Sequence, residues 1–168
     1  QNMKFSLVML EYVICIVLGV GLSFMVNIPF LLTEIWLLVM GIFYNVKPIR
    51  TKDIAYLDVL SESVNNMIRL MLGWFVVCES FYPPSSIMVG YWMTGAFLMA
   101  IKRYAEYRMI GNPELAGAYR KSFSKYTEAT LLSSAIFYAL CATFLIGIFL
   151  LKYRLLKLVQ IVLIILIT

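Results

Sequence analysis

The sequence predicts an all-α fold, a polytopic bundle of transmembrane helices that forms one domain over residues 1–168. Composition is the first observation, since 62% of the residues are hydrophobic and only 14% are charged. Soluble domains are usually about half apolar, with about a quarter of their residues charged. Length is the second, because a chain of 168 residues is too small to bury this apolar excess in a water-soluble core. Lipid is therefore the expected solvent for the outward faces.

Apolar stretches make up most of the chain, and about six of them are expected to be spans. Most are long enough to cross roughly 30 Å of hydrocarbon at about 1.5 Å per residue. The second stretch is shorter and follows Asn27-Ile28-Pro29, a break with proline near a helix start, which predicts the return helix of a hairpin. The last is short because the sequence stops at Thr168. The expected spans are residues 5–26, 30–44, 55–78, 85–104, 127–151 and 155–168.

Basic residues between the spans predict the orientation in the membrane. When the spans are counted in order, Lys4 and the connections 45–54 and 102–125 fall on one side, together with ten of the fourteen basic residues. The positive-inside rule makes that side cytoplasmic. The three basic residues within 152–157 fall on the other side and do not fit this count. We expect an integral protein of a bacterial plasma membrane with its basic loops in the cytoplasm.

Several functions are not supported by the residues present. The net charge of +5 is explained by membrane orientation, so no nucleic-acid partner is expected. There is no histidine, and Cys15, Cys78 and Cys141 lie far apart, which argues against a zinc site, a haem with two histidine ligands or a disulfide framework. The sequence has no Gly-x-Gly-x-x-Gly fingerprint and no Walker lysine, so nucleotide-driven chemistry has no support.

The segment 55–74 carries polar side chains in an otherwise apolar helix. Spacings of three and four residues place them on one helical face. Because a charge near the bilayer centre costs about 2.5–3.5 kcal/mol, this stripe is expected to line a protein interior or a wet cavity. The alternative is a buried salt bridge between Glu62 and Arg69 that fixes the helix register without any ligand. The stripe consists of Asp58, Glu62, Asn65, Asn66 and Arg69.

A second charged cluster lies at the basic end of the span 85–104, where Lys102, Arg103 and Glu106 fall within one helical turn. With the basic residues of the connection 45–54 it would form a positive mouth for phosphate or pyrophosphate, which arginine binds through two hydrogen bonds. On charge count alone, an orientation signal with lipid-headgroup contacts explains the cluster equally well. Acidic residues favour a site, because orientation needs no acids and magnesium prefers oxygen ligands. The basic residues of the connection are Lys47, Arg50 and Lys52, and the acids are Asp53 and Glu106.

These stretches resemble the UbiA superfamily of intramembrane prenyltransferases. The loop Tyr44-Asn45-Val46-Lys47-Pro48-Ile49-Arg50-Thr51-Lys52-Asp53 resembles the family's Tyr-Ser-x-x-Pro-x-Arg-x-Lys loop, with Asn45 in place of serine, and Leu57-Asp58-Val59-Leu60 continues into the next helix. The stretches 102–106 and 119–127 are similar to the second motif region of the branch that makes polyprenyl-phosphate phosphoribose. There Lys-Arg-x-x-Glu stands where other branches have Asp-x-x-x-Asp.

The resemblance implies the later part of a nine-helix cup whose cavity admits a polyprenyl chain from the membrane. It implies Mg²⁺ as cofactor and a membrane isoprenoid as substrate. The family's first aspartate-rich motif, Asn-Asp-x-x-Asp, is absent, so we expect a fragment that lacks the preceding spans. The implied candidate catalytic residues are Asp58, Glu62, Arg69 and Glu106, of which only Glu106 is a candidate metal ligand. The implied phosphate-binding residues are Lys47, Arg50, Lys52, Lys102 and Arg103, and Asn65 and Asn66 are polar residues of the cavity.

Two functions follow from this reading. The first is an enzyme that releases pyrophosphate, either by prenyl transfer or by phosphoribosyl transfer to a polyprenyl phosphate. The Lys-Arg-x-x-Glu variant favours phosphoribosyl transfer. The second is a non-catalytic scaffold or lipid-holding subunit, with partner subunits in a larger membrane complex. A small transporter is weaker, because the charges gather at one face and one stripe and form no path through both faces.

Overall fold

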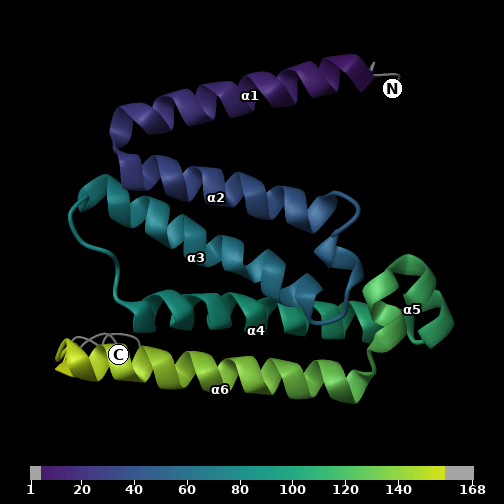
Figure 1. The fold of residues 1–168 in the computed structure, drawn as a ribbon. Helices are drawn as coiled ribbons and strands as arrows, with labels where there is room; N and C mark the ends of the chain where they lie inside the picture. Colours follow the sequence, from purple (N-terminus) through teal and green to yellow (C-terminus); the bar gives the residue numbers. More distant parts are fainter. Residues whose placement is uncertain (1–4, 158–168) are drawn as a thin grey trace, which may run out of the picture.

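The computed structural model describes residues 5–157, and over this range the chain is all-helical with no strand. This confirms the predicted fold class. The long helices lie side by side, and each packs against the next, with α4 between α3 and α6 (Figure 1). The elements are α1 (Phe5–Val26), α2 (Ile28–Asn45), the 3-10 helix η1 (Thr51–Asp53), α3 (Leu57–Val77), α4 (Ser85–Ile110), α5 (Pro113–Tyr119), the 3-10 helix η2 (Lys121–Lys125) and α6 (Glu128–Lys152).

The hairpin between α1 and α2 forms where the sequence predicted it. Asn27 caps α2, since its side-chain oxygen accepts a hydrogen bond from the Phe30 backbone N–H at 2.8 Å. Pro29 lies in the first turn, where its missing N–H costs nothing. The Asn27 side-chain nitrogen also donates to the Phe75 carbonyl at 2.7 Å. The same residue therefore starts α2 and ties this end of the hairpin to the end of α3.

Helix α4 is longer than the predicted span 85–104, because it continues to Ile110. It ends at Gly111, whose φ of 68° is the left-handed conformation that commonly terminates helices. Hydropathy falls at Lys102, but backbone hydrogen bonding does not require apolar side chains, so the span and the helix end at different residues. The predicted connection 102–125 is therefore largely helical: the end of α4 is followed by α5 and η2.

The apolar helices make this an integral membrane protein. Among the described residues, α1, α2 and α6 are each long and apolar enough to cross a bilayer. Helices α3 and α4 have similar lengths but also carry the charged residues of the site. Of the sixth expected span, 155–168, the part from 158 onward lies outside the described residues.

The two basic connections meet at one end of the bundle, as the order of the spans predicted (Figure 1). A buried aromatic cluster joins them: Tyr107, Phe123 and Tyr126 pack together with Ala116 and Leu131. The Tyr126 hydroxyl also accepts a hydrogen bond from the Tyr56 backbone N–H. This packing brings the segments 46–56 and 111–127 together and creates the site described next.

Candidate functional site: a basic cavity beside an arginine–carboxylate network

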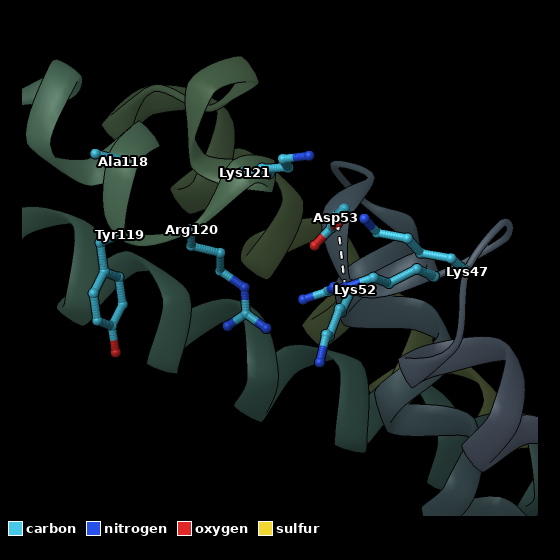
Figure 2. Close-up of a pocket in the computed structure, with 8 residues that line it drawn as sticks. Lys47, Lys52, Asp53, Ala118, Tyr119, Arg120 and Lys121 are labelled. Atoms are coloured by element: carbon cyan, nitrogen blue, oxygen red, sulfur yellow. Dashed lines mark ion pairs between the residues drawn. The ribbon is translucent and has the colours of Figure 1, made fainter.

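A cavity of about 450 Å³ opens between the two basic connections (Figure 2). One wall comes from the segment around η1, and the opposite wall from the end of α5 and the start of η2. We call it the basic cavity, because it combines five cationic side chains with one carboxylate. It is lined by Lys47, Arg50, Lys52, Asp53, Ala118, Tyr119, Arg120 and Lys121.

Two of the cationic groups already have partners close by in the sequence. The Arg50 Nε lies 3.3 Å from an Asp53 carboxylate oxygen, and Lys52 Nζ donates to the Asn45 side-chain oxygen at 3.1 Å. Arg50 has a φ of 33°, which is left-handed and uncommon for a residue with a side chain. Such backbone conformations persist where the surrounding structure holds them, often at binding sites. With five cations and one carboxylate among its lining residues, the basic cavity has a net positive lining.

The structure corrects the composition of the predicted positive mouth. Lys47, Arg50 and Lys52 do line one cavity, but the residues that face them are Arg120 and Lys121, in place of the expected Lys102 and Arg103. Lys102 is exposed on α4, and Arg103 is buried against α3. Adjacent positions on a helix differ by about 100° in direction, so these two neighbours cannot share a face.

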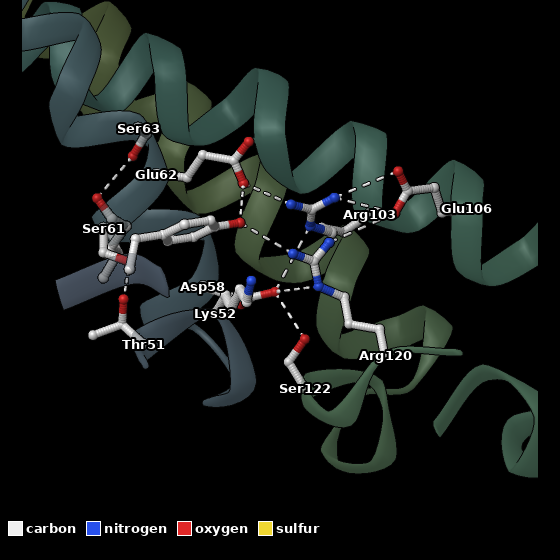
Figure 3. Close-up of polar contacts among 12 residues, drawn as sticks. Thr51, Lys52, Asp58, Ser61, Glu62, Ser63, Arg103, Glu106, Arg120 and Ser122 are labelled. Atoms are coloured by element: carbon white, nitrogen blue, oxygen red, sulfur yellow. Dashed lines mark hydrogen bonds and ion pairs between the residues drawn. The ribbon is translucent and has the colours of Figure 1, made fainter. Parts of the chain in front are cut away.

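Behind the basic cavity, Asp58 forms the centre of a buried charged cluster (Figure 3). Its side chain is fully buried in the first turn of α3. One carboxylate oxygen accepts a hydrogen bond from the Ser122 hydroxyl at 2.9 Å and the other from the Tyr126 hydroxyl at 2.8 Å. Burial raises the pKa of Tyr126, and the neighbouring Asp58 carboxylate raises it further, so this phenol stays a protonated donor.

Arg103 bridges three carboxylates from α3 and α4. Its Nη2 lies 2.6 Å from Glu62, its Nη1 lies 3.1 Å from Glu106, and its Nε lies 3.7 Å from Asp58. The side chain is only 4% exposed. Charged hydrogen bonds of this length are among the stronger ones in proteins. Arg103 therefore neutralises carboxylates inside the protein, whereas the sequence predicted that it neutralises phosphate.

Arg120 is one of several residues of this site that sequence reasoning did not single out, and it contacts two of the predicted carboxylates. Its Nε lies 3.8 Å from Asp58, its Nη1 lies 4.0 Å from Glu106, and its Nη2 donates to the Tyr44 hydroxyl at 3.1 Å. The Tyr44 hydroxyl in turn donates to Glu62 at 2.7 Å. The available signal was its position in the motif-like stretch 119–127. We call the following set the arginine–carboxylate network: Asp58, Glu62, Arg103, Glu106 and Arg120.

Only part of the predicted polar stripe enters this network. Asn66 packs against α4, where a Cβ added to Gly95 would lie 2.6 Å from its side-chain nitrogen. The side-chain oxygen of half-buried Asn65 has no hydrogen-bond partner among the described residues. Arg69 is exposed and lines an apolar groove with neighbours such as Gly73. The alternative pairing of Glu62 with Arg69 is wrong, because Glu62 pairs with Arg103.

The carboxylates of the described residues do not fit a magnesium site. Mg²⁺ requires several oxygen ligands in near-ideal octahedral geometry. No group of three or more aspartate, glutamate, cysteine or histidine side chains within residues 5–157 could hold a metal ion. Glu106, the candidate ligand from the sequence, is paired with Arg103, and Asp58 is enclosed by hydrogen-bond donors and two guanidinium groups.

Fold and site together define a class of protein: a polytopic membrane helix bundle with a basic cavity at one end. A comparison with models of protein families identifies the family within this class. The model described as the UbiA prenyltransferase family matches residues 3–168, and the chain belongs to this family. No curated protein and no solved structure matches the chain significantly. The resemblance seen in the two motif-like stretches is therefore confirmed at the level of the family.

Proposed function

We propose that this protein is a membrane transferase that acts on a long-chain isoprenoid and releases pyrophosphate, with the basic cavity holding the phosphate end of a substrate. The observation that carries this proposal is the basic cavity itself, where five cationic side chains from two distant connections surround one space. Family membership supports the isoprenoid, since UbiA proteins are prenyltransferases of membrane substrates.

The position of the basic cavity suits a substrate with an anionic head and an apolar tail. The cavity lies at the end of the bundle where the spans give way to the connections, so a head bound there leaves the tail among the membrane helices. Fixed cations stabilise the charge that develops on a departing pyrophosphate without reorganising during the reaction. By the positive-inside rule this end is cytoplasmic, and we place the protein in a bacterial plasma membrane.

Phosphoribosyl transfer is the reaction that we favour within the family. The Lys102-Arg103-Tyr104-Ala105-Glu106 stretch supports this branch. An oxygen of the polyprenyl phosphate would attack C1 of the ribose, and the bond from C1 to the pyrophosphate oxygen would break. Such a reaction needs room for two phosphorylated groups. A second cavity, of about 620 Å³, adjoins the first and shares Lys47, Arg50, Asp53 and Lys121 with it.

A matched pair of lysines in η2 tests the proposal. Lys121 lines the basic cavity, whereas exposed Lys125 does not. In the full-length protein in lipid nanodiscs, pyrophosphate release from phosphoribosyl pyrophosphate and polyprenyl phosphate should fall at least about tenfold in kcat/KM for Lys121→Gln, as expected for losing a charged hydrogen bond. Lys125→Gln should match the wild type.

The same assay with an isoprenyl diphosphate and an aromatic acceptor distinguishes the other branches of the family. Turnover with that pair alone would overturn the phosphoribosyl assignment and leave the phosphate-binding cavity in place. Equal activity of Lys121→Gln and Lys125→Gln would overturn the cavity assignment. Retention of polyprenyl phosphate without turnover of either pair would favour a lipid-holding subunit.

A further inference from the structure

We propose that Arg120 is a mobile ligand of the bound anion: it leaves Asp58 and Glu106 when a multiply charged phosphate group enters the basic cavity. This rests on the proposed function and deepens it. Among the described residues, Arg120 alone belongs to both the basic cavity and the arginine–carboxylate network. It is therefore the one side chain whose contacts with an anion and with the carboxylates are directly linked.

The two arginines of the network are held very differently. Arg103 has carboxylate contacts at 2.6 and 3.1 Å and is 4% exposed. Arg120 has carboxylate contacts only at 3.8 and 4.0 Å and is 18% exposed. Its side-chain hydrogen bond within the described residues is to the neutral Tyr44 hydroxyl, whereas those of Arg103 are to carboxylates. Arg120 is thus attracted to the carboxylates by charge without the short hydrogen bonds that would hold it there.

A phosphate group offers Arg120 what the carboxylates do not. Its oxygens can accept two parallel hydrogen bonds from a planar guanidinium, which strengthens and orients the contact. The Arg120 backbone stays hydrogen-bonded to Ala116 and Phe123, so its side chain can turn while the backbone remains in place. Figure 2 shows its guanidinium on the cavity side, facing the segment that carries Lys52.

Asp58 and Glu106 keep other partners for their negative charges when Arg120 moves away. Asp58 keeps its hydrogen bonds from Ser122 and Tyr126, and Glu106 keeps its pair with Arg103. Three carboxylates would then share a single guanidinium, which is electrostatically unfavourable. Only a ligand with enough negative charge can offset this change, so the arrangement selects pyrophosphate over inorganic phosphate or a singly charged anion.

Calorimetric titration of the full-length protein in nanodiscs with inorganic pyrophosphate tests this coupling. Arg120→Gln should weaken the Kd at least about tenfold, whereas Arg108→Gln removes an equal charge from an exposed site outside the cavity and should change it less than about twofold. Tyr44→Phe removes the hydrogen bond that holds Arg120 near the carboxylates, so pyrophosphate should bind several-fold more tightly. An arginine with only a structural role would not produce this gain in affinity.

The variant Arg120→Lys is a control in case Arg120→Gln does not fold. Arg120→Lys keeps the charge but lacks the planar fork, so it should remain folded by thermal unfolding, bind pyrophosphate more weakly and no longer gain from Tyr44→Phe. Wild-type affinity in Arg120→Gln or Arg120→Lys, with Lys121→Gln weakened, would overturn the role of Arg120 and leave the proposed function intact. A wild-type protein that binds no pyrophosphate would overturn both.

Discussion

Arg103 Nη2 lies 2.6 Å from Glu62 Oε2, and this contact joins neighbouring membrane helices α3 and α4. The same guanidinium reaches Glu106 and Asp58, so one side chain compensates three carboxylates. Breaking a buried ion pair by removing one member is costly, because the remaining charge stays desolvated. The arginine–carboxylate network is therefore expected to stabilise the fold, and the unfolding of variants can test this separately from activity.

Loss of the Arg103 charge should destabilise the protein strongly. Arg103→Gln leaves three carboxylates with only the distant Arg120, and a loss of about 3–5 kcal/mol is expected for an uncompensated buried pair. Arg108→Gln, at an exposed position of the same helix, should cost less than about 0.5 kcal/mol. Thermal or denaturant unfolding in detergent measures both. Similar stability of the two variants would contradict a central role for Arg103.

Two serines of η2 provide a matched test of the Asp58 site. Ser122 is buried and donates to the Asp58 carboxylate, whereas exposed Ser124 donates only to the Lys121 carbonyl. A hydrogen bond to a charged group contributes about 1.5–3 kcal/mol, so Ser122→Ala should lower the free energy of unfolding by that amount. Ser124→Ala should change it by less than about 0.5 kcal/mol. The prediction fails if the two variants unfold together.

Close packing between α3 and α4 depends on Gly95. A Cβ at this position would meet the Asn66 side chain at 2.6 Å and Ser63 at 3.4 Å, whereas Gly73 has open space around it. Gly95→Leu should therefore cost at least about 1–3 kcal/mol through overpacking. Gly73→Leu should be tolerated and slightly favours the helix. Melting temperatures in detergent compare them, and an unchanged value for Gly95→Leu would show that this helix contact is loose.

The phenol of Tyr126 gives a pH dependence with a defined sign. Its pKa is raised in the folded protein, so folding favours the protonated form. This contribution is fully present below the unfolded pKa of about 10 and is lost as pH rises through the higher folded pKa. The stability advantage of the wild type over Tyr126→Phe should therefore be constant from pH 7 to about 9 and shrink above about 10. An advantage that grows with alkaline pH would contradict the assignment.

Much of the fold could be predicted because its causes are local. Hydropathy and the Asn27-Ile28-Pro29 break fix the α1–α2 hairpin within a few residues. The end of α4 was missed because hydropathy reports where a span leaves the lipid, while Gly111 determines where the helix stops. Asp58 and Glu62 were predicted to face an interior, and they do, because unpaired charges on an apolar helix require one.

By itself, the sequence determined the helices, the membrane environment and the end of the bundle where the charges gather, since each depends on neighbouring residues. Only the tertiary structure decided which charges meet. Ser122 and Asp58 are 64 residues apart in the sequence. The residue pattern of one helix does not predict which distant segment packs against its polar face. Arg69 shares a face with Asp58 but lies about 16 Å further along α3, away from the carboxylate of Asp58 in the first turn. Long-range packing therefore separated Arg103, which pairs with buried carboxylates, from the residues that line the cavity.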